Sequence, residues 1–183
     1  MSIVLESITT IEKAPTAKKT YQIDWSAFLR VQDKEKVLIT AASNVSPVVV
    51  TIKQGYPTNL SDATPVFIAG CLGNTSPNGF RYLKFVTSTT YQLYTDAALT
   101  TAVVGNGAFI AGSAYLWVVD PIVTATWTFP AGLTKVSDSK TGVTTTVTVS
   151  GGTSGQVYAV TLLIVTVSGM EDPRIINFTI APV

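Results

Sequence analysis

The stretch Val123-Thr-Ala-Thr-Trp-Thr-Phe129 decides the fold class of this chain. Its apolar residues occupy every second position, and threonines fill the positions between them. Successive side chains of a β-strand point to opposite faces, so this alternation predicts a strand with one buried face and one face of hydroxyl groups. The same period of two recurs at 20–25, 143–149 and 176–180. We therefore predict an all-β protein.

The composition supports the same fold class. Threonine supplies 28 and valine 23 of the 183 residues, and these β-branched side chains suit strands better than helices. Apolar residues make up 46% of the chain, which is enough to build a packed core. Charged residues make up 13% and sum to a net charge of +1. No broad basic surface exists to follow a phosphate backbone, and we expect no nucleic-acid partner.

Most groups that carry out catalysis or bind metals are missing. Histidine is absent, so Ser-His and Cys-His dyads and imidazole metal sites cannot form. The single Cys71 lies in the apolar run 66–72, which predicts a buried structural thiol. The glycine-rich segment 150–155 lacks the lysine of a phosphate-binding loop and precedes a β-branched run, which favours a hairpin turn. We predict a protein without enzymatic activity, metal or cofactor.

The sequence also predicts the compartment of synthesis. The first residues lack the basic and long apolar regions of a signal peptide. The longest apolar run, 157–167, is shorter than the ~20 residues that a membrane helix needs. A single cysteine is also typical of a reducing compartment. We expect synthesis in a cytoplasm and no membrane partner.

The chain changes in texture along its length. Residues 1–19 read as an N-terminal arm, and the alternating strands described above lie in 20–45 and 120–183. Between them, over 46–119, short apolar runs alternate with turn signals, including Asn78-Gly79 and Asn106-Gly107, which favour type I′ hairpin turns. About six short strands at this spacing predict a small β-barrel or sandwich.

Several motifs of the outer segments resemble a known group of phage proteins. They share a Tyr-x-x-Asp-Trp-Ser strand, a Thr-x-Trp strand, a Ser-Gly-Gly-Thr-x-Gly turn and a Thr-x-x-Gly hairpin, in this order, with small immunoglobulin-like virion proteins of tailed bacteriophages that serve as fibre–tail adaptors or similar structural components. The motifs are moderately specific, because they are patterns of turns and core residues. In this chain they stand at 21–29, 122–133, 144–158, 164–169 and 178–180.

The middle segment is similar to a small β-module that is common in phage structural proteins. Its pattern is Val-x-Ile-x-Gly, then Asn-Gly, Tyr-x-Leu-Tyr-x-Asp and a Gly-x-Tyr-x-x-Gly-Gly close, found here at 66–73, 78–79, 91–96 and 107–112. The chain departs from the pattern at Phe109, where tyrosine is expected, and at Ser113, where the second glycine is expected.

The two resemblances together imply an immunoglobulin-like β-sandwich that is interrupted by the smaller module. The sandwich would comprise 20–45 and 120–183, with Ser46-Pro47 and Asp120-Pro121 at the two crossing points. Insertion at an exposed loop is reasonable when the ends of the inserted module lie close together. The alternative is one sandwich that carries a long β excursion.

The resemblance implies a structural component of the virion, synthesised in the cytoplasm of the bacterial host. The expected role is a tail or neck adaptor that attaches fibres through contacts with other virion proteins, in several symmetric copies or a ring. A capsid decoration or head-fibre protein is the alternative within this class. An alternative from another class is a glycan-binding module for host recognition, which needs exposed rings on one face. Its candidates are Tyr56, Tyr94 and Tyr115, whereas Trp25, Trp117 and Trp127 read as core residues.

The arm carries the candidate interface residues. Ile3, Leu5, Ile8 and Ile11 precede the first signature strand and have no evident partner in the sandwich. Exposed apolar residues usually mark an interface, and an extended segment can add a strand to the sheet edge of another subunit. The arm is therefore expected to contact a neighbouring chain. The alternative, with equal weight, is that it supplies an edge strand to its own domain.

Overall fold

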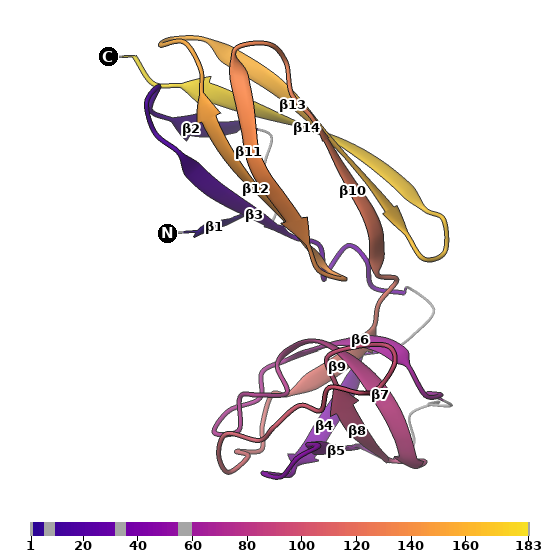
Figure 1. Cartoon of the computed structure of the whole chain (residues 1–183). Coiled ribbons are helices and arrows are strands. Elements are labelled where there is room, and N and C mark those ends of the chain that lie inside the picture. Colours follow the sequence, from indigo (N-terminus) through magenta and orange to yellow (C-terminus); the bar gives the residue numbers. More distant parts are fainter. Residues whose placement is uncertain (1, 6–9, 32–35, 55–59, 183) are drawn as a thin grey trace. The chain divides into compact units, whose positions relative to one another are not determined.

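The computed structural model describes residues 2–5, 10–31, 36–54 and 60–182. All regular structure in these residues is β-strand, which confirms the predicted fold class. The chain divides into two compact units, one made of residues 1–29 and 120–183 and the other of residues 30–119 (Figure 1). In the described part of the chain, no helix could span a membrane.

The first unit is a sandwich of two four-stranded sheets. The strand orders are β1-β3-β12-β11 in one sheet and β10-β13-β14-β2 in the other. Neighbours are antiparallel except at two edges, where β1 runs parallel to β3 and β2 runs parallel to β14. The strands are β1 (Ser2–Leu5), β2 (Thr10–Lys13), β3 (Lys19–Asp24), β10 (Ile122–Thr128), β11 (Leu133–Lys140), β12 (Thr144–Gly151), β13 (Val157–Thr166) and β14 (Glu171–Ile180).

The core of the sandwich follows from the alternation in its strands. Tyr21 of β3 meets Phe178 of β14 between the sheets, with ring centroids 5.2 Å apart and an interplanar angle of 75°. Val147 and Val149 of β12 and Leu162 of β13 are fully buried beside them. Each such side chain contributes about 1.5–3 kcal/mol on burial. The long apolar run around Leu162 is a central strand because sheet neighbours lie on both of its sides.

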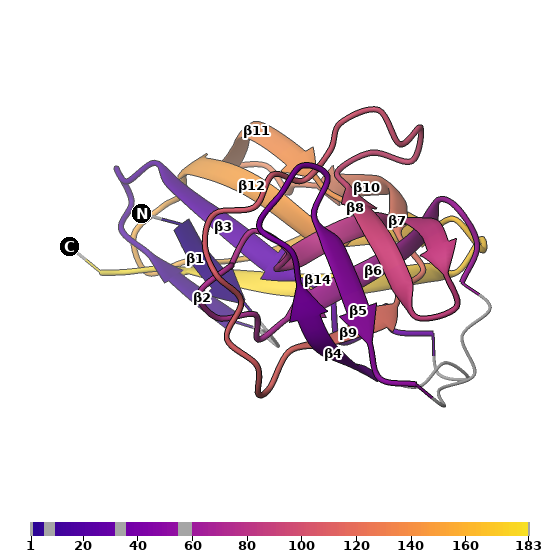
Figure 2. The ribbon, with the colours of Figure 1, turned by 90° about the horizontal axis from the view of Figure 1, so that it is seen from below.

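The second unit is a closed six-stranded barrel, with the strand order β4-β5-β8-β7-β6-β9 (Figure 2). Alternate residues of these strands point inward and fill the interior, as in the fully buried Val50, Val66, Leu83, Leu93 and Leu116. Closure removes sheet edges from this unit. The strands are β4 (Val37–Ala42), β5 (Val49–Ile52), β6 (Thr64–Ala69), β7 (Gly79–Thr87), β8 (Thr90–Tyr94) and β9 (Tyr115–Val118).

The first crossing point differs from the expected one. The chain passes into the barrel between Leu29 and Arg30, not near Ser46. β4 pairs with β5 and β9, so the barrel cannot close without it. Ser46-Pro47 lies in the connection between β4 and β5. Serine and proline favour a hairpin turn as well as a linker between domains, so the sequence alone does not separate the two. The second crossing lies at Asp120 as expected, and the Asp120 amide donates to the Leu29 carbonyl at 2.9 Å, so the two crossing points are adjacent.

The barrel loops are held by asparagine side chains and not by the predicted type I′ turns. Neither Asn78 nor Asn106 has a positive φ, which a type I′ turn requires. The Asn78 amide instead accepts from the Cys71 backbone N–H at 2.9 Å and donates to the Cys71 carbonyl at 3.0 Å. The Asn106 Oδ1 accepts from the backbone N–H groups of Thr75 and Ser76. Asparagine favours loops here because it bonds to backbone groups.

Candidate interaction surfaces

No metal-binding cluster forms in the part of the chain that the structure describes. Those residues contain no group of three or more His, Cys, Asp or Glu side chains that could hold a metal ion. Cys71 is 1% exposed, as predicted for a structural thiol. Burial raises the pKa of this thiol to about 11, so it stays protonated and unreactive at neutral pH.

The backbone of the arm pairs within its own domain. On β1, Ile3 and Leu5 are aligned with Tyr21 and Ile23 of β3. On β2, Ile11 is aligned with Phe178 of β14 and is 7% exposed. Ile8 lies outside the described residues. The structure thus places β1 and β2 as edge strands of their own sandwich, and it buries Ile11 there.

The Lys13 side chain connects this arm to the rest of the sandwich. The sequence pattern did not predict this role. Its side chain is fully buried, and its ammonium donates to the carbonyls of Ala14 at 2.8 Å, Pro15 at 3.2 Å and Gly151 at 2.7 Å. Gly151 ends β12, in the sheet opposite β2. A buried ammonium must be fully hydrogen-bonded to be tolerated. Lys13 therefore links the arm to the opposite sheet.

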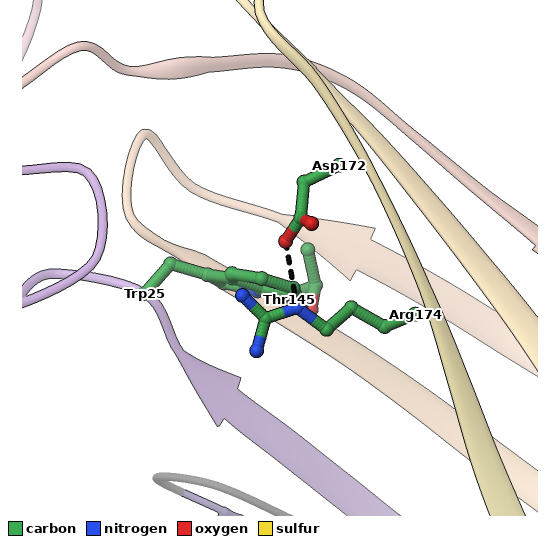
Figure 3. A network of polar contacts seen from close by, with 4 residues as sticks. All are labelled: Trp25, Thr145, Asp172 and Arg174. Atoms are coloured by element: carbon green, nitrogen blue, oxygen red, sulfur yellow. Dashed lines mark hydrogen bonds and ion pairs between the residues drawn. The ribbon is translucent and has the colours of Figure 1, made fainter.

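A polar network surrounds Trp25, the residue that follows β3 (Figure 3). Trp25 is 2% exposed, and its indole N–H donates to the Thr145 hydroxyl at 3.0 Å. The Arg174 guanidinium lies 4.9 Å from the centroid of the Trp25 ring and 4.7 Å from that of Phe28. Its Nε donates to Asp172 at 2.6 Å. The motif residue Trp25 therefore serves the packing of the sandwich and is not free to stack on a ligand.

The aromatic residues considered for glycan binding do not form one exposed face. Tyr94 is buried at 8% exposure, Tyr115 is half-buried beneath the Lys36 ammonium, and Tyr56 lies outside the described residues. Of the tryptophans, Trp25 and Trp127 are core residues as predicted. Trp117 is not.

Trp117 is half-buried because its neighbour Leu116 takes the inward position of β9. Alternation along the strand then turns Trp117 to the outside of the barrel. There its ring packs against Phe67, with centroids 5.1 Å apart.

The two long edges of the sandwich differ in charge. β11 is exposed along its length after Leu133 and carries Lys135, Asp138 and Lys140. Its register also shifts between Lys135 and Ser137. β10 carries no charged residue, and Thr124, Thr126 and Thr128 are exposed. From residue 124 to residue 128 it pairs regularly with β13 and has no neighbour on its other side. Over 124–128 the β10 edge therefore lacks the charges and the shift in register that protect the β11 edge against strand pairing.

Comparison with known proteins places this sandwich in a phage context. Residues 108–179 match the family described as podophage GP4 fiber-tail adaptor protein gp77. The resemblance to phage fibre–tail adaptors is confirmed. The match covers β9 to β13 and all but the last residue of β14. A comparison with curated proteins found no match.

The match identifies the kind of protein that this chain resembles. Over 108–179 the chain is similar to a structural component of a phage tail, whose role is that of an adaptor to other virion proteins. The matched strands include the β10 edge and the Thr145, Asp172 and Arg174 side chains of the network in Figure 3.

Proposed function

We propose that this protein is a non-enzymatic component of a tailed-phage particle that joins fibres to the tail through protein–protein contacts. The observation that carries the proposal is the match to fibre–tail adaptors over 108–179, which includes five of the eight sandwich strands. The low share of charged residues supports a role in contacts between proteins, because the cores of protein interfaces are depleted of charge.

The protein would act in several copies. A tail that carries fibres presents the same attachment point repeatedly around its axis, so adaptors are expected as a ring or a symmetric set. Each copy would contribute the same surface, and the fibres would bind to equivalent positions. A protein of the capsid surface or of head fibres would instead occupy sites on the head.

The proposal is tested with particles that are produced without this chain. We expect heads and tails to assemble, fibres to be missing in electron micrographs, and fibre attachment to return when the chain is supplied from a plasmid. Particles that keep their fibres without the chain would contradict the proposal. Loss of a head feature with fibres intact would favour the capsid decoration or head-fibre alternative.

A further inference from the structure

We propose that the edge of β10 binds an extended strand of another virion protein, so that the partner extends the sheet β10-β13-β14-β2 by one strand. The proposal rests on the proposed adaptor function and names the surface that makes one of its contacts.

The edge strands of the sandwich differ in their protection against pairing with other strands. An unpaired edge presents a row of free N–H and C=O groups, and natural proteins protect such edges with short strands, charges or bulges. β1 and β2 are only four residues long. β11 is longer, but it carries three charged side chains and a shift in register. β10 is seven residues long, and it lacks charge, proline and glycine. Its own shift in register lies at its start, between Ile122 and Thr124, where Lys140 Nζ also donates to the Ile122 carbonyl at 3.3 Å, so that the unprotected stretch is 124–128.

The composition of β10 also distinguishes it from the edge strand β11. Its sequence Ile122-Val-Thr-Ala-Thr-Trp-Thr128 combines high β-propensity with no charge, which is the signature of a segment prone to pair with other strands. Val123 at its start is 47% exposed. An exposed strand of this kind is a liability unless the assembly covers it.

The chemistry of the edge determines the kind of occupant. The complement of a free strand edge is an extended backbone, and pockets or alternate side chains then give specificity. The exposed hydroxyls of Thr124, Thr126 and Thr128 favour β-branched or hydroxyl-bearing partners, because Thr–Thr pairs across strands are stabilising. Absence of charge on β10 means that the incoming strand needs none. The regular stretch from 124 to 128 accommodates about 17 Å of partner strand.

We assign the strand to a different virion protein, because the match over 108–179 is to an adaptor between fibre and tail, and a second copy could offer only its own β10 edge. Every strand in the described residues is already paired within this chain, including β1 and β2 of the arm. Lys13 also holds the arm to its own domain through three carbonyl bonds. A second copy therefore offers no free described strand to β10 except its own β10 edge.

The test labels an introduced cysteine with a maleimide, because the single natural cysteine, Cys71, is buried. Because this thiol is 1% exposed, Thr126→Cys introduces a single accessible thiol on the β10 edge. The matched control is Ser139→Cys on the exposed β11 edge. Each variant is treated with a maleimide, as free protein and in intact particles. We expect the introduced thiols of both variants to react in the free protein. In the particle, we expect only the Thr126→Cys variant to lose reactivity.

The possible outcomes separate the inference from the proposed function. Equal behaviour of the two thiols in particles would overturn the inference alone. Protection of the thiol at 126 in a free protein of dimeric mass would also overturn it, because the occupant would then be a second copy. Absence of the unmodified chain from particles would overturn the proposed function and the inference together.

A second pair of variants tests the same edge by charge. Thr126→Lys adds the protection that β11 already has, and Ser139→Lys is the control. We expect both free proteins to keep the melting temperature of the wild type, and only Thr126→Lys to lose incorporation or fibre attachment. Normal incorporation and normal fibre number for Thr126→Lys would contradict the inference.

Discussion

At the scale of single residues, stability depends on polar side chains that form hydrogen bonds with backbone groups. Lys13 does this for three carbonyls, and Asn78 pairs with both backbone groups of Cys71. A buried polar group that is left without a partner costs about 1–3 kcal/mol, which is more than the bond itself contributes. Each of these two side chains is therefore expected to contribute measurably to the free energy of unfolding.

Lys13→Met tests the role of this ammonium. The variant keeps most of the side-chain volume but leaves the carbonyls of Ala14, Pro15 and Gly151 without their donor. We expect the free energy of unfolding of the sandwich to fall by about 1–3 kcal/mol. Urea unfolding followed by the fluorescence of the tryptophans measures it. The exposed Lys18→Met is the control and should stay within about 0.5 kcal/mol of the wild type. Equal effects of the two changes would contradict this role.

Cys71 should be inert in the folded protein. Burial raises its pKa to about 11, so the thiolate is scarce at pH 8 and the sulfur is shielded from reagents. We expect no reaction with a disulfide reagent until urea unfolds the barrel. Rapid reaction of the native protein would show that the barrel opens near Cys71.

The Asp96 carboxylate should make the stability of the barrel depend on pH. The Thr100 backbone N–H, together with the Thr101 N–H and the Thr100 hydroxyl, donates to this carboxylate and lowers its pKa. A lowered pKa in the folded state stabilises the loop above the unfolded value of 3.8, and this contribution is lost as the pH falls through the folded value. The melting temperature of the barrel should therefore fall as the pH drops below the unfolded pKa of 3.8. Asp96→Asn should reduce this fall, and an unchanged pH profile in that variant would contradict the assignment.

At the scale of elements, the alternation of apolar and polar residues predicted the long strands well. β10, β12 and the end of β14 lie where the period of two placed them, because burial of one face sets that pattern directly. β1 and β2 did not follow from the pattern, since four-residue parallel edge strands depend on contacts with strands distant in sequence. Burial of Lys13 could not be predicted either, because its acceptors include Gly151, 138 residues away.

The arm is expected to contribute to the stability of its own sandwich. Deletion of residues 1–14 removes β1, β2 and the Lys13 anchor, and it exposes the sheet face that Ile11 covers. We expect the melting temperature of the sandwich to fall clearly, with little change in the barrel, as measured by calorimetry. A truncated protein that melts like the wild type but fails to enter particles would instead support a contact of the arm with a neighbouring chain.

At the scale of the whole molecule, two units share one chain because the barrel is inserted at a single point of the sandwich. The adjacent positions of Leu29 and Asp120 let the sandwich close as though the barrel were a loop. Sequence texture placed the second crossing correctly, but it assigned β4 to the sandwich because the β4–β5 turn looks like a linker. Closure of a barrel is a property of all six strands and is not visible in any one of them.

The barrel should fold on its own. Residues 30–119 contain all six strands and their own hydrophobic core. We expect limited proteolysis to cut near residues 30 and 120 and to release a protected fragment, and the separately expressed segment 30–119 to melt cooperatively. If no protected fragment forms and the isolated segment is unfolded, the two units are not independent.

The proposed adaptor role is decided by electron cryo-microscopy of intact particles. We expect repeated density at the junction of tail and fibres into which the sandwich and the barrel fit as two bodies, with a further strand beside β10. Density for the chain on the head, or a fibre junction without it, would contradict that role.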